Sequence, residues 1–324
     1  MDAGEIVPAE LQEAPAAAFR SIDGLLSRHH AAIEAGDLAI FTGPNTPGVN
    51  ATDELVRETA AYARARGLRI SSHVAESKAV IEAIRRDRGA SGVVSYLDRL
   101  GLVGPELLAA HAVWLRPAEI RLLGRRGAAI SHNPVSNMFL ADGVAPIPEL
   151  LRAGVVVALG TDGAASNNSQ SMFEVIKAAS LLQRVHRLDP GALTPAQAIR
   201  MATINGAIAL GRGDELGSLE AGKRADLVVL DPRRAAAGVA IHDVASHVVH
   251  ALGPWSVDTV FVDGRVVLRD GRATRVDRDA TLASGQRAGE TLVGRYADRY
   301  GAASSWSPRA ASPAIATTPA ARPG

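Results

Sequence analysis

The sequence predicts an α/β fold in which parallel strands alternate with helices, followed by a small β module. Three observations lead to this prediction. Short apolar runs alternate with amphipathic helical patterns between residues 37 and 163, as expected for parallel βα units. Most of these runs end in a polar residue that could do chemistry. After residue 217 the pattern changes to short strands with alternating hydrophobicity.

The expected strands and helices follow each other at the spacing of βα units. Gly67 and Gly154 each lie between a helical pattern and the next strand, where a helix C-cap belongs. The expected strands are 37–42, 68–73, 107–111, 128–132 and 155–162, and the expected helices between them are 52–65, 77–86, 117–125 and 146–153.

Four of the five strands end in His73, His111, His132 or Asp162. In a parallel (β/α) barrel the carboxyl ends of the strands form the active-site face. A single histidine of this kind is more often a hydrogen-bonded core residue than a ligand. Four such residues in series favour a catalytic face.

Two helices and a β module are expected after the last strand. A helix is predicted over 170–187, and a second over 195–210 with Thr194 as N-cap and Pro195 in its first turn. The ranges 217–232 and 257–271 have strand patterns, and Asp263-Gly264 is a hairpin turn signal. The tail from residue 302 is rich in Ala, Ser and Pro, which is typical of disorder.

Composition excludes several classes of function. The 35 basic and 34 acidic residues balance, so charge gives no reason to expect nucleic-acid or membrane binding. The absence of cysteine excludes disulfides, thiolate metal sites and a cysteine nucleophile. The acidic N-terminal segment does not resemble a secretory signal, and no apolar run is long enough for a membrane span. A cytoplasmic protein is expected.

Two histidines at strand ends are candidates for metal or proton chemistry. His73 closes a strand and Glu76 follows three residues later. A neutral imidazole is a good zinc or iron ligand, and a nearby carboxyl can carry protons between water and substrate. His111 is a second candidate at the next strand end, where the alternative is a histidine bonded only to a backbone carbonyl.

The last two strand ends carry further candidates. Asn133-Pro134 ends the strand 128–132, and Asn137 follows as a candidate substrate contact or as a turn former only. Asp162 ends a continuous apolar strand, where a carboxylate is costly unless it is paired or bound to metal. Its alternative role is to cap the next helix.

Together these motifs resemble the amidohydrolase superfamily. The similarity is to the branch with S-adenosylhomocysteine/5′-methylthioadenosine deaminases, guanine deaminases and triazine hydrolases. It covers about residues 37–295. The matching segments, in order, are GPNTPGVNATDEL, HVAES, AAHAVWL, SHNPVSNMFLADGVAPIPELLRAGVVVALGTDGAASNN, ATINGAIALG, GSLEAGKRADLVVLD and VFVDGRVV.

The resemblance implies a role for each strand-end residue. His73 and Asp162 would be metal ligands for one Zn²⁺ or Fe²⁺ per site, and Asp162 would also be the general base. Glu76 would be the acid/base, and His111 would polarise the attacking water or stabilise the tetrahedral intermediate. Substrate would contact Glu76, His111 and Asn137. The implied reaction is deamination of a small N-heterocycle, and loss of halide or alkylamine from a triazine is the alternative.

The sequence departs from the family at the first barrel strand, because it has no His-x-His pair. Its adjacent histidines His29 and His30 point to different faces of a helical stretch over 19–35. The resemblance therefore implies strands 4 to 8 of a (β/α)8 TIM barrel and part of a small β-sandwich, with ~90 barrel residues absent.

The expected domains are a helical segment at 1–36, a partial barrel at 37–212, a β-sandwich half with a C-terminal helix at 213–301, and a disordered tail at 302–324. Three explanations for the missing strands remain open. The chain is a fragment or an internal start of a longer gene, a non-catalytic paralogue, or one half of a site that a partner completes. Open strand edges invite pairing, so a homo-oligomer is also an expectation.

Overall fold

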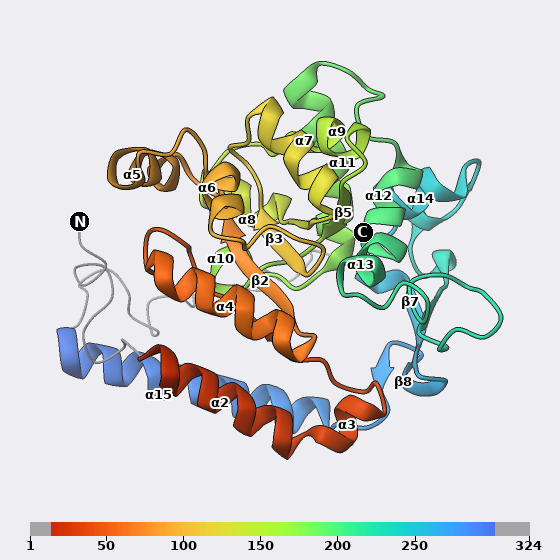
Figure 1. The fold of residues 1–324 in the computed structure, drawn as a ribbon. Coiled ribbons are helices and arrows are strands. Elements are labelled where there is room, and N and C mark those ends of the chain that lie inside the picture. The colour runs from red at the N-terminus through yellow and green to blue at the C-terminus, as the bar shows by residue number, and fades with distance from the viewer. Residues whose placement is uncertain (1–13, 302–324) are drawn as a thin grey trace, which may run out of the picture.

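The computed structural model describes residues 14–301, and the expected disordered tail lies outside the described residues. A five-stranded parallel sheet forms the centre of the molecule, in the order β1-β2-β3-β4-β5, and helices surround it (Figure 1). Its strands are β1 (Phe41–Thr42), β2 (Arg69–Val74), β3 (Leu107–His111), β4 (Ala129–His132) and β5 (Val156–Leu159).

Each strand pairs with the next one along the chain, and every pair is parallel. The predicted parallel α/β fold is therefore confirmed. Within the described residues β1 and β5 stand at the two edges, so this sheet is not closed into a barrel. That these strands are numbers 4 to 8 of a barrel stays a prediction.

The helices that follow the first four strands begin and end at residues that cap a helix well. The Thr52 side chain caps the first of them by accepting from the Leu55 amide, and Gly67 ends it at φ 63°. Gly127 ends a later one at φ 70°, a left-handed conformation that glycine adopts without steric cost. These helices are α4 (Asp53–Arg66), α5 (Lys78–Arg88), α6 (Val93–Arg99), α7 (Pro117–Arg126), α8 (Pro134–Phe139) and α9 (Ile147–Arg152).

The core lies mainly on one face of the parallel sheet. Ile70, Leu107, Ile130 and Val157 point to this face and belong to one cluster of buried side chains. The other face is covered by a small cluster centred on alanines, with a contribution from α13. The sheet is thus anchored on its helix-covered face, and its second face has little apolar packing.

Four further helices follow β5 along the chain. The helix expected over 195–210 is two helices, so that prediction was wrong in detail. Thr203 has φ −125° and ψ −100°, which breaks the helical path. Thr194 and Gln197 cap the first of them reciprocally, as the sequence predicts for Thr194. The helices are α10 (Ala164–Asn167), α11 (Met172–Arg187), α12 (Pro195–Ala202) and α13 (Ile204–Ala209).

The β module is a four-stranded sheet in the order β6-β7-β8-β9, with antiparallel pairs. Within the range 217–232, where short strands are predicted, Leu227–Leu230 form one strand. Asp263-Gly264 turns between two strands as predicted. The elements are β6 (Leu227–Leu230), α14 (Val244–His250), β7 (Val257–Val262), β8 (Arg265–Arg269), β9 (Arg272–Ala273) and α15 (Arg278–Tyr300).

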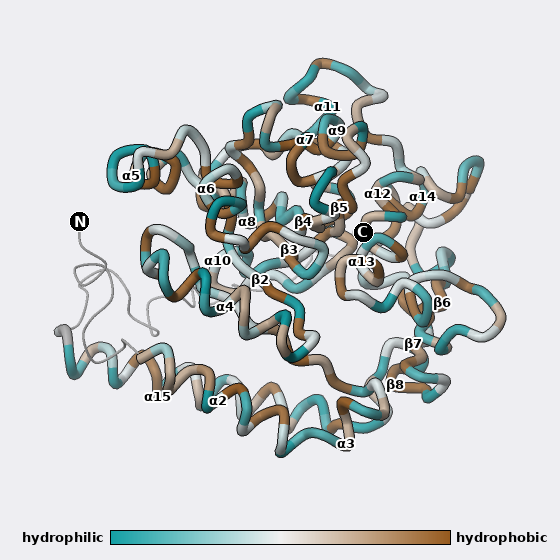
Figure 2. Tube along the Cα trace, in the orientation of Figure 1, coloured by the Kyte–Doolittle hydropathy of each residue, from teal (hydrophilic) through white to brown (hydrophobic). Residues whose placement is uncertain are grey.

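The N-terminal helices α2 (Pro15–Arg28) and α3 (His30–Glu34) lie outside the sheet and its core. Asp23 of α2 binds Arg66 and the Tyr62 hydroxyl of α4, and α2 has no buried residue. Apolar and polar positions alternate along α2 and α15 (Figure 2). Among the described residues, no helix has the length and apolar character that crossing a membrane requires.

Gly43 follows β1 at a point where the backbone approaches β2 very closely. A Cβ atom here would lie 1.9 Å from the Ser71 carbonyl oxygen. We expect Gly43→Ala to lower the free energy of unfolding by at least about 2 kcal/mol, because backbone must shift to relieve the clash. Urea denaturation measures the effect.

Gly24→Ala is the matched control, since Gly24 is in the exposed interior of α2 and its added Cβ meets nothing within 4 Å. This change should stabilise the protein by up to about 1 kcal/mol. Equal urea midpoints for Gly43→Ala and wild type would contradict the packing described for β1.

Candidate active site

The side chains that could bind metal or carry protons lie at the carboxyl ends of β2, β3 and β5. In the β2–β3 register His73 is opposite Ala110 and Val74 is opposite His111, so the two histidines come from adjacent strand ends. Asp162 follows the end of β5 by three residues. Parallel pairing places all of these ends at one edge, where barrel enzymes have their active sites.

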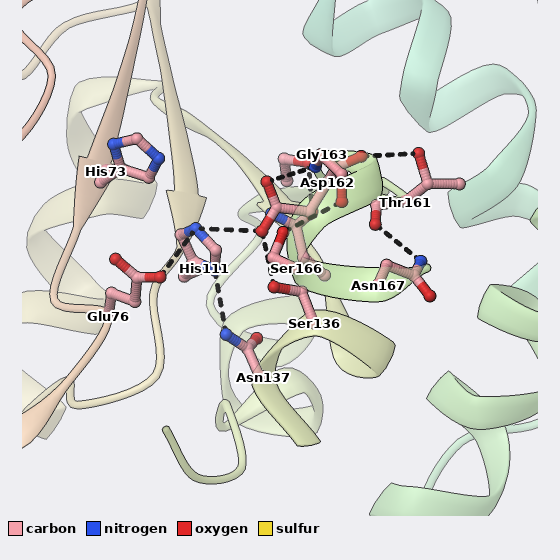
Figure 3. Close-up of polar contacts among 12 residues, drawn as sticks. His73, Glu76, His111, Ser136, Asn137, Thr161, Asp162, Gly163, Ser166 and Asn167 are labelled. Carbon is pink, nitrogen blue, oxygen red and sulfur yellow. Dashed lines mark hydrogen bonds and ion pairs between the residues drawn. The ribbon is translucent and has the colours of Figure 1, made fainter. Parts of the chain in front are cut away.

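His111 lies at the centre of this group (Figure 3). Its Nε2 atom is 3.4 Å from Glu76 Oε1 and 3.9 Å from Asp162 Oδ2. The ring of His73 stacks beside it, with centroids 5.4 Å apart and planes at 21°. The structure therefore brings together the four residues that the sequence singled out for metal and proton chemistry.

His73 is held from behind by the main chain. Its Nδ1 atom is 2.8 Å from the Asn45 carbonyl oxygen. A carbonyl can only accept, so Nδ1 carries the proton and the Nε2 lone pair is free. This is how metal-binding histidines are commonly oriented. Sequence reasoning missed Asn45, because its contribution is a backbone carbonyl and its side chain gives no signal.

Asp162 is fixed in an ionised state. Its Oδ2 accepts from Ser136 Oγ at 2.6 Å and its Oδ1 from the Gly163 amide at 2.8 Å. Burial acts to raise the pKa of this carboxyl, but the hydrogen bonds from Ser136 and Gly163 outweigh it and hold the pKa below its usual value. Neither α10 nor α11, the two helices that follow, begins with a side-chain cap, so Asp162 does not have the alternative capping role.

His111 is buried and neutral. Its side chain is 1% exposed, and burial lowers the pKa of the imidazole to about 4, with the neighbouring His73 acting in the same direction against the Asp162 charge. Both His111 and Asp162 have left-handed backbone, at φ 73° and 62°. Such conformations are costly for residues other than glycine and cluster at functional sites.

Glu76 has the properties of a proton carrier. Burial raises the pKa of its carboxyl, and the negative charges of Asp142 and Asp162 add to this rise while His73 opposes it. A carboxyl with a raised pKa keeps its proton to higher pH than a free glutamate, which is the change that a general acid requires. The side chain remains 21% exposed, so this carboxyl is in contact with solvent.

Asn137 does not point toward open space. Its amide nitrogen is 2.9 Å from His111 Nδ1, and the residue is 1% exposed. His132, the remaining strand-end histidine, is fully buried, and neither ring nitrogen has a hydrogen-bond partner in the described structure. Asp142 was missed by the sequence reasoning; its carbonyl accepts from the Trp114 indole at 2.7 Å beside the site.

The donor atoms fit a divalent metal in type but not in number. His73 offers a free Nε2 and Asp162 an ionised carboxylate, each oriented by a hydrogen bond. Catalytic zinc takes three or more protein ligands. Within residues 14–301 no group of three or more His, Asp or Glu side chains is arranged to hold a metal ion. This part of the chain therefore provides an incomplete donor set.

Comparison with known families identifies the architecture. The model of the amidohydrolase family matches residues 34–267. The chain belongs to the amidohydrolase family. This confirms the resemblance drawn from the ordered motifs, and it places His73, Glu76, His111 and Asp162 inside the matched region.

Related proteins of the amidohydrolase family have deaminase names. The 5′-deoxyadenosine deaminase of Methanothermobacter thermautotrophicus is 42% identical over 257 residues, 79% of this chain and 59% of that protein. The 5-methylthioadenosine/S-adenosylhomocysteine deaminase of Desulforudis audaxviator is 39% identical over 262 residues, 80% of this chain and 60% of that protein. The chain thus spans about three fifths of the length of these relatives.

A solved structure agrees with the fold. The zinc-bound adenosine deaminase from Xanthomonas campestris superposes with a TM-score of 0.75 at 34% identity, covering 78% of this chain and 57% of that one. The parallel sheet and the helices around it are therefore those of an amidohydrolase.

His132 gives the fold a predictable dependence on pH. Burial lowers the pKa of its imidazole to about 3, and His111 adds to the effect. In the unfolded chain the pKa is about 6.5, so only the unfolded state takes up a proton between these values. Stability should therefore fall as pH drops from about 6.5. His132→Leu should reduce this slope by about 1.4 kcal/mol per pH unit, measured by urea denaturation at pH 4.5 to 7.5.

His186→Gln is the control, because His186 is exposed on α11 and its loss should leave the slope unchanged. Identical slopes for wild type and His132→Leu would show that His132 is not held neutral.

Proposed function

We propose that this chain carries catalytic residues of a metal-dependent aminohydrolase that removes the amino group of a purine-like nucleoside. The observation that carries the proposal is the position of His111 Nε2 between the Glu76 and Asp162 carboxyls at the strand ends. Deaminases of 5′-deoxyadenosine and 5-methylthioadenosine/S-adenosylhomocysteine are among the relatives, which supports this substrate class.

His73 and Asp162 would hold one divalent cation, zinc or iron, together with donors beyond the described residues. A bound cation of this kind lowers the pKa of water toward ~7. The hydrogen bonds to Asp162 lower the pKa of its carboxyl and keep it ionised. The carboxylate can therefore accept the proton of the attacking water. Water adds to the ring carbon that bears the amino group.

Glu76 and His111 would handle the remaining charge. Glu76, whose pKa is raised by burial, gives a proton to the ring nitrogen next to the attacked carbon, which draws electrons away from that carbon. His111 donates a hydrogen bond to the new oxygen. The amino group then takes the proton held by Asp162 and leaves as ammonia, and the proton of the new hydroxyl returns to Glu76, so that the ring keeps a carbonyl.

Activity assays with 5′-deoxyadenosine and 5′-methylthioadenosine test the proposal. In a zinc-loaded preparation that turns over either nucleoside, Asp162→Ala should lower kcat/KM by at least about 10³-fold, because base and metal ligand are lost together. Glu76→Gln should cost about 10²- to 10⁴-fold. Ammonia release and the change in purine absorbance measure both.

Glu149→Gln is the control carboxylate, since Glu149 pairs with Arg187 away from the site and its loss should leave turnover near the wild-type rate. Undiminished turnover in Asp162→Ala would exclude the proposed role. Release of chloride or alkylamine from a triazine, with no ammonia from either nucleoside, would favour the alternative hydrolase.

A further inference from the structure

Asn137 is a buried amide in contact with the central histidine, His111. It lies on α8 directly beneath His111, and the Asn137 Nδ2 to His111 Nδ1 distance is 2.9 Å (Figure 3). An amide nitrogen can only donate a hydrogen bond and an imidazole nitrogen can do either. The contact therefore determines which ring nitrogen of His111 carries the proton, provided that the amide is fixed in this orientation.

The nearby Asp142 carboxyl favours that orientation. The Asn137 amide acts to lower the pKa of this carboxyl, as expected when the amide nitrogen faces it, and a carboxylate accepts but does not donate. The Asp142 backbone is itself anchored, since its amide donates to the Asn137 carbonyl at 2.9 Å and its carbonyl accepts from Trp114 at 2.7 Å. An amide turned by 180° would direct its oxygen at the carboxylate.

The opposite side of the His111 ring favours the same proton placement. His111 Nε2 faces the oxygens of Glu76 and Asp162 at 3.4 and 3.9 Å and has no hydrogen-bond partner within the described residues. An unprotonated Nε2 would direct its lone pair at two carboxyl groups. A protonated Nε2 directs an N–H at them.

We infer that Asn137, oriented by Asp142, is a positioning residue that holds neutral His111 in the tautomer with the proton on Nε2. His111 then enters the site as a fixed hydrogen-bond donor and cannot serve as a base there. This leaves the first proton acceptance to the Asp162 carboxyl and the proton donation to the Glu76 carboxyl. The catalytic consequence rests on the proposed function, whereas the tautomer is a property of the chain alone.

Long-range ¹H–¹⁵N histidine spectra of the ¹⁵N-labelled 324-residue protein read the tautomer directly. They need neither metal nor substrate, so their result is independent of the proposed function. His111→Gln identifies the His111 signals by their loss. At pH 7 we expect Nε2 protonated and Nδ1 bare. A wild-type His111 with the proton on Nδ1 would overturn the inference.

Two substitutions test the cause. In Asn137→Asp the new carboxylate accepts from the ring, so the proton should move to Nδ1 or both nitrogens should be protonated. In Asn137→Leu the donor to Nδ1 is gone and only the Glu76 and Asp162 oxygens still favour the proton on Nε2, so the Nδ1–H tautomer should become detectable. Asn167→Ala is the matched control, since Asn167 is another buried amide that bonds only the Thr161 carbonyl, and His111 should be unaffected by it.

An unchanged Nε2–H tautomer in folded Asn137→Asp and Asn137→Leu would show that Asn137 does not set it. Where the protein turns over, Asn137→Asp should also lower kcat by about 10²-fold with little change in KM, as expected for a lost donor to the developing oxygen. A kcat loss without a tautomer change would point to a structural effect and overturn the assignment.

Discussion

Parallel pairing of β2, β3, β4 and β5 is the constraint on which the site depends. Because each strand pairs in parallel with the next, residues separated by as many as 89 positions meet at one edge, from His73 to Asp162. The helix-covered face of the sheet contains the large buried cluster. The core thus holds the strands in place, and the strand ends determine which side chains can approach each other.

Burial and hydrogen bonding then give each group a different protonation state. The pKa of Glu76 is raised by burial, the pKa of Asp162 is lowered by its hydrogen bonds, and the pKa of His111 is lowered to about 4, so His111 is neutral at physiological pH. Groups whose environments separate their pKa values in this way divide acid and base roles between them. The left-handed backbone at His111 and Asp162 costs about 1–3 kcal/mol each. The buried core against which the sheet packs offsets the free energy of this strain. The strained backbone in turn fixes the directions of the His111 and Asp162 side chains.

The sequence predicts the strands well because buried parallel strands are continuous apolar runs that end in polar residues. The ends at His73 and His111 could be read in this way, and Thr194 and Gly67 marked helix boundaries. The break at Thr203 was not predictable, since it depends on a backbone angle and no residue type requires it. The role of Asn45 was also hidden, because it acts through its carbonyl. Asn137 was expected near the substrate, and only the three-dimensional contact shows its bond to His111.

We propose that His73 and Asp162 are the metal-binding residues of this part of the chain. Zinc titration by calorimetry, with Co²⁺ absorption as a second reading, tests it most directly. We predict one weakly bound ion per chain, because two ligands are fewer than a catalytic zinc site uses. This binding should be lost in both His73→Ala and Asp162→Ala and kept in His186→Ala. Binding that survives either of the first two substitutions unchanged would contradict the account.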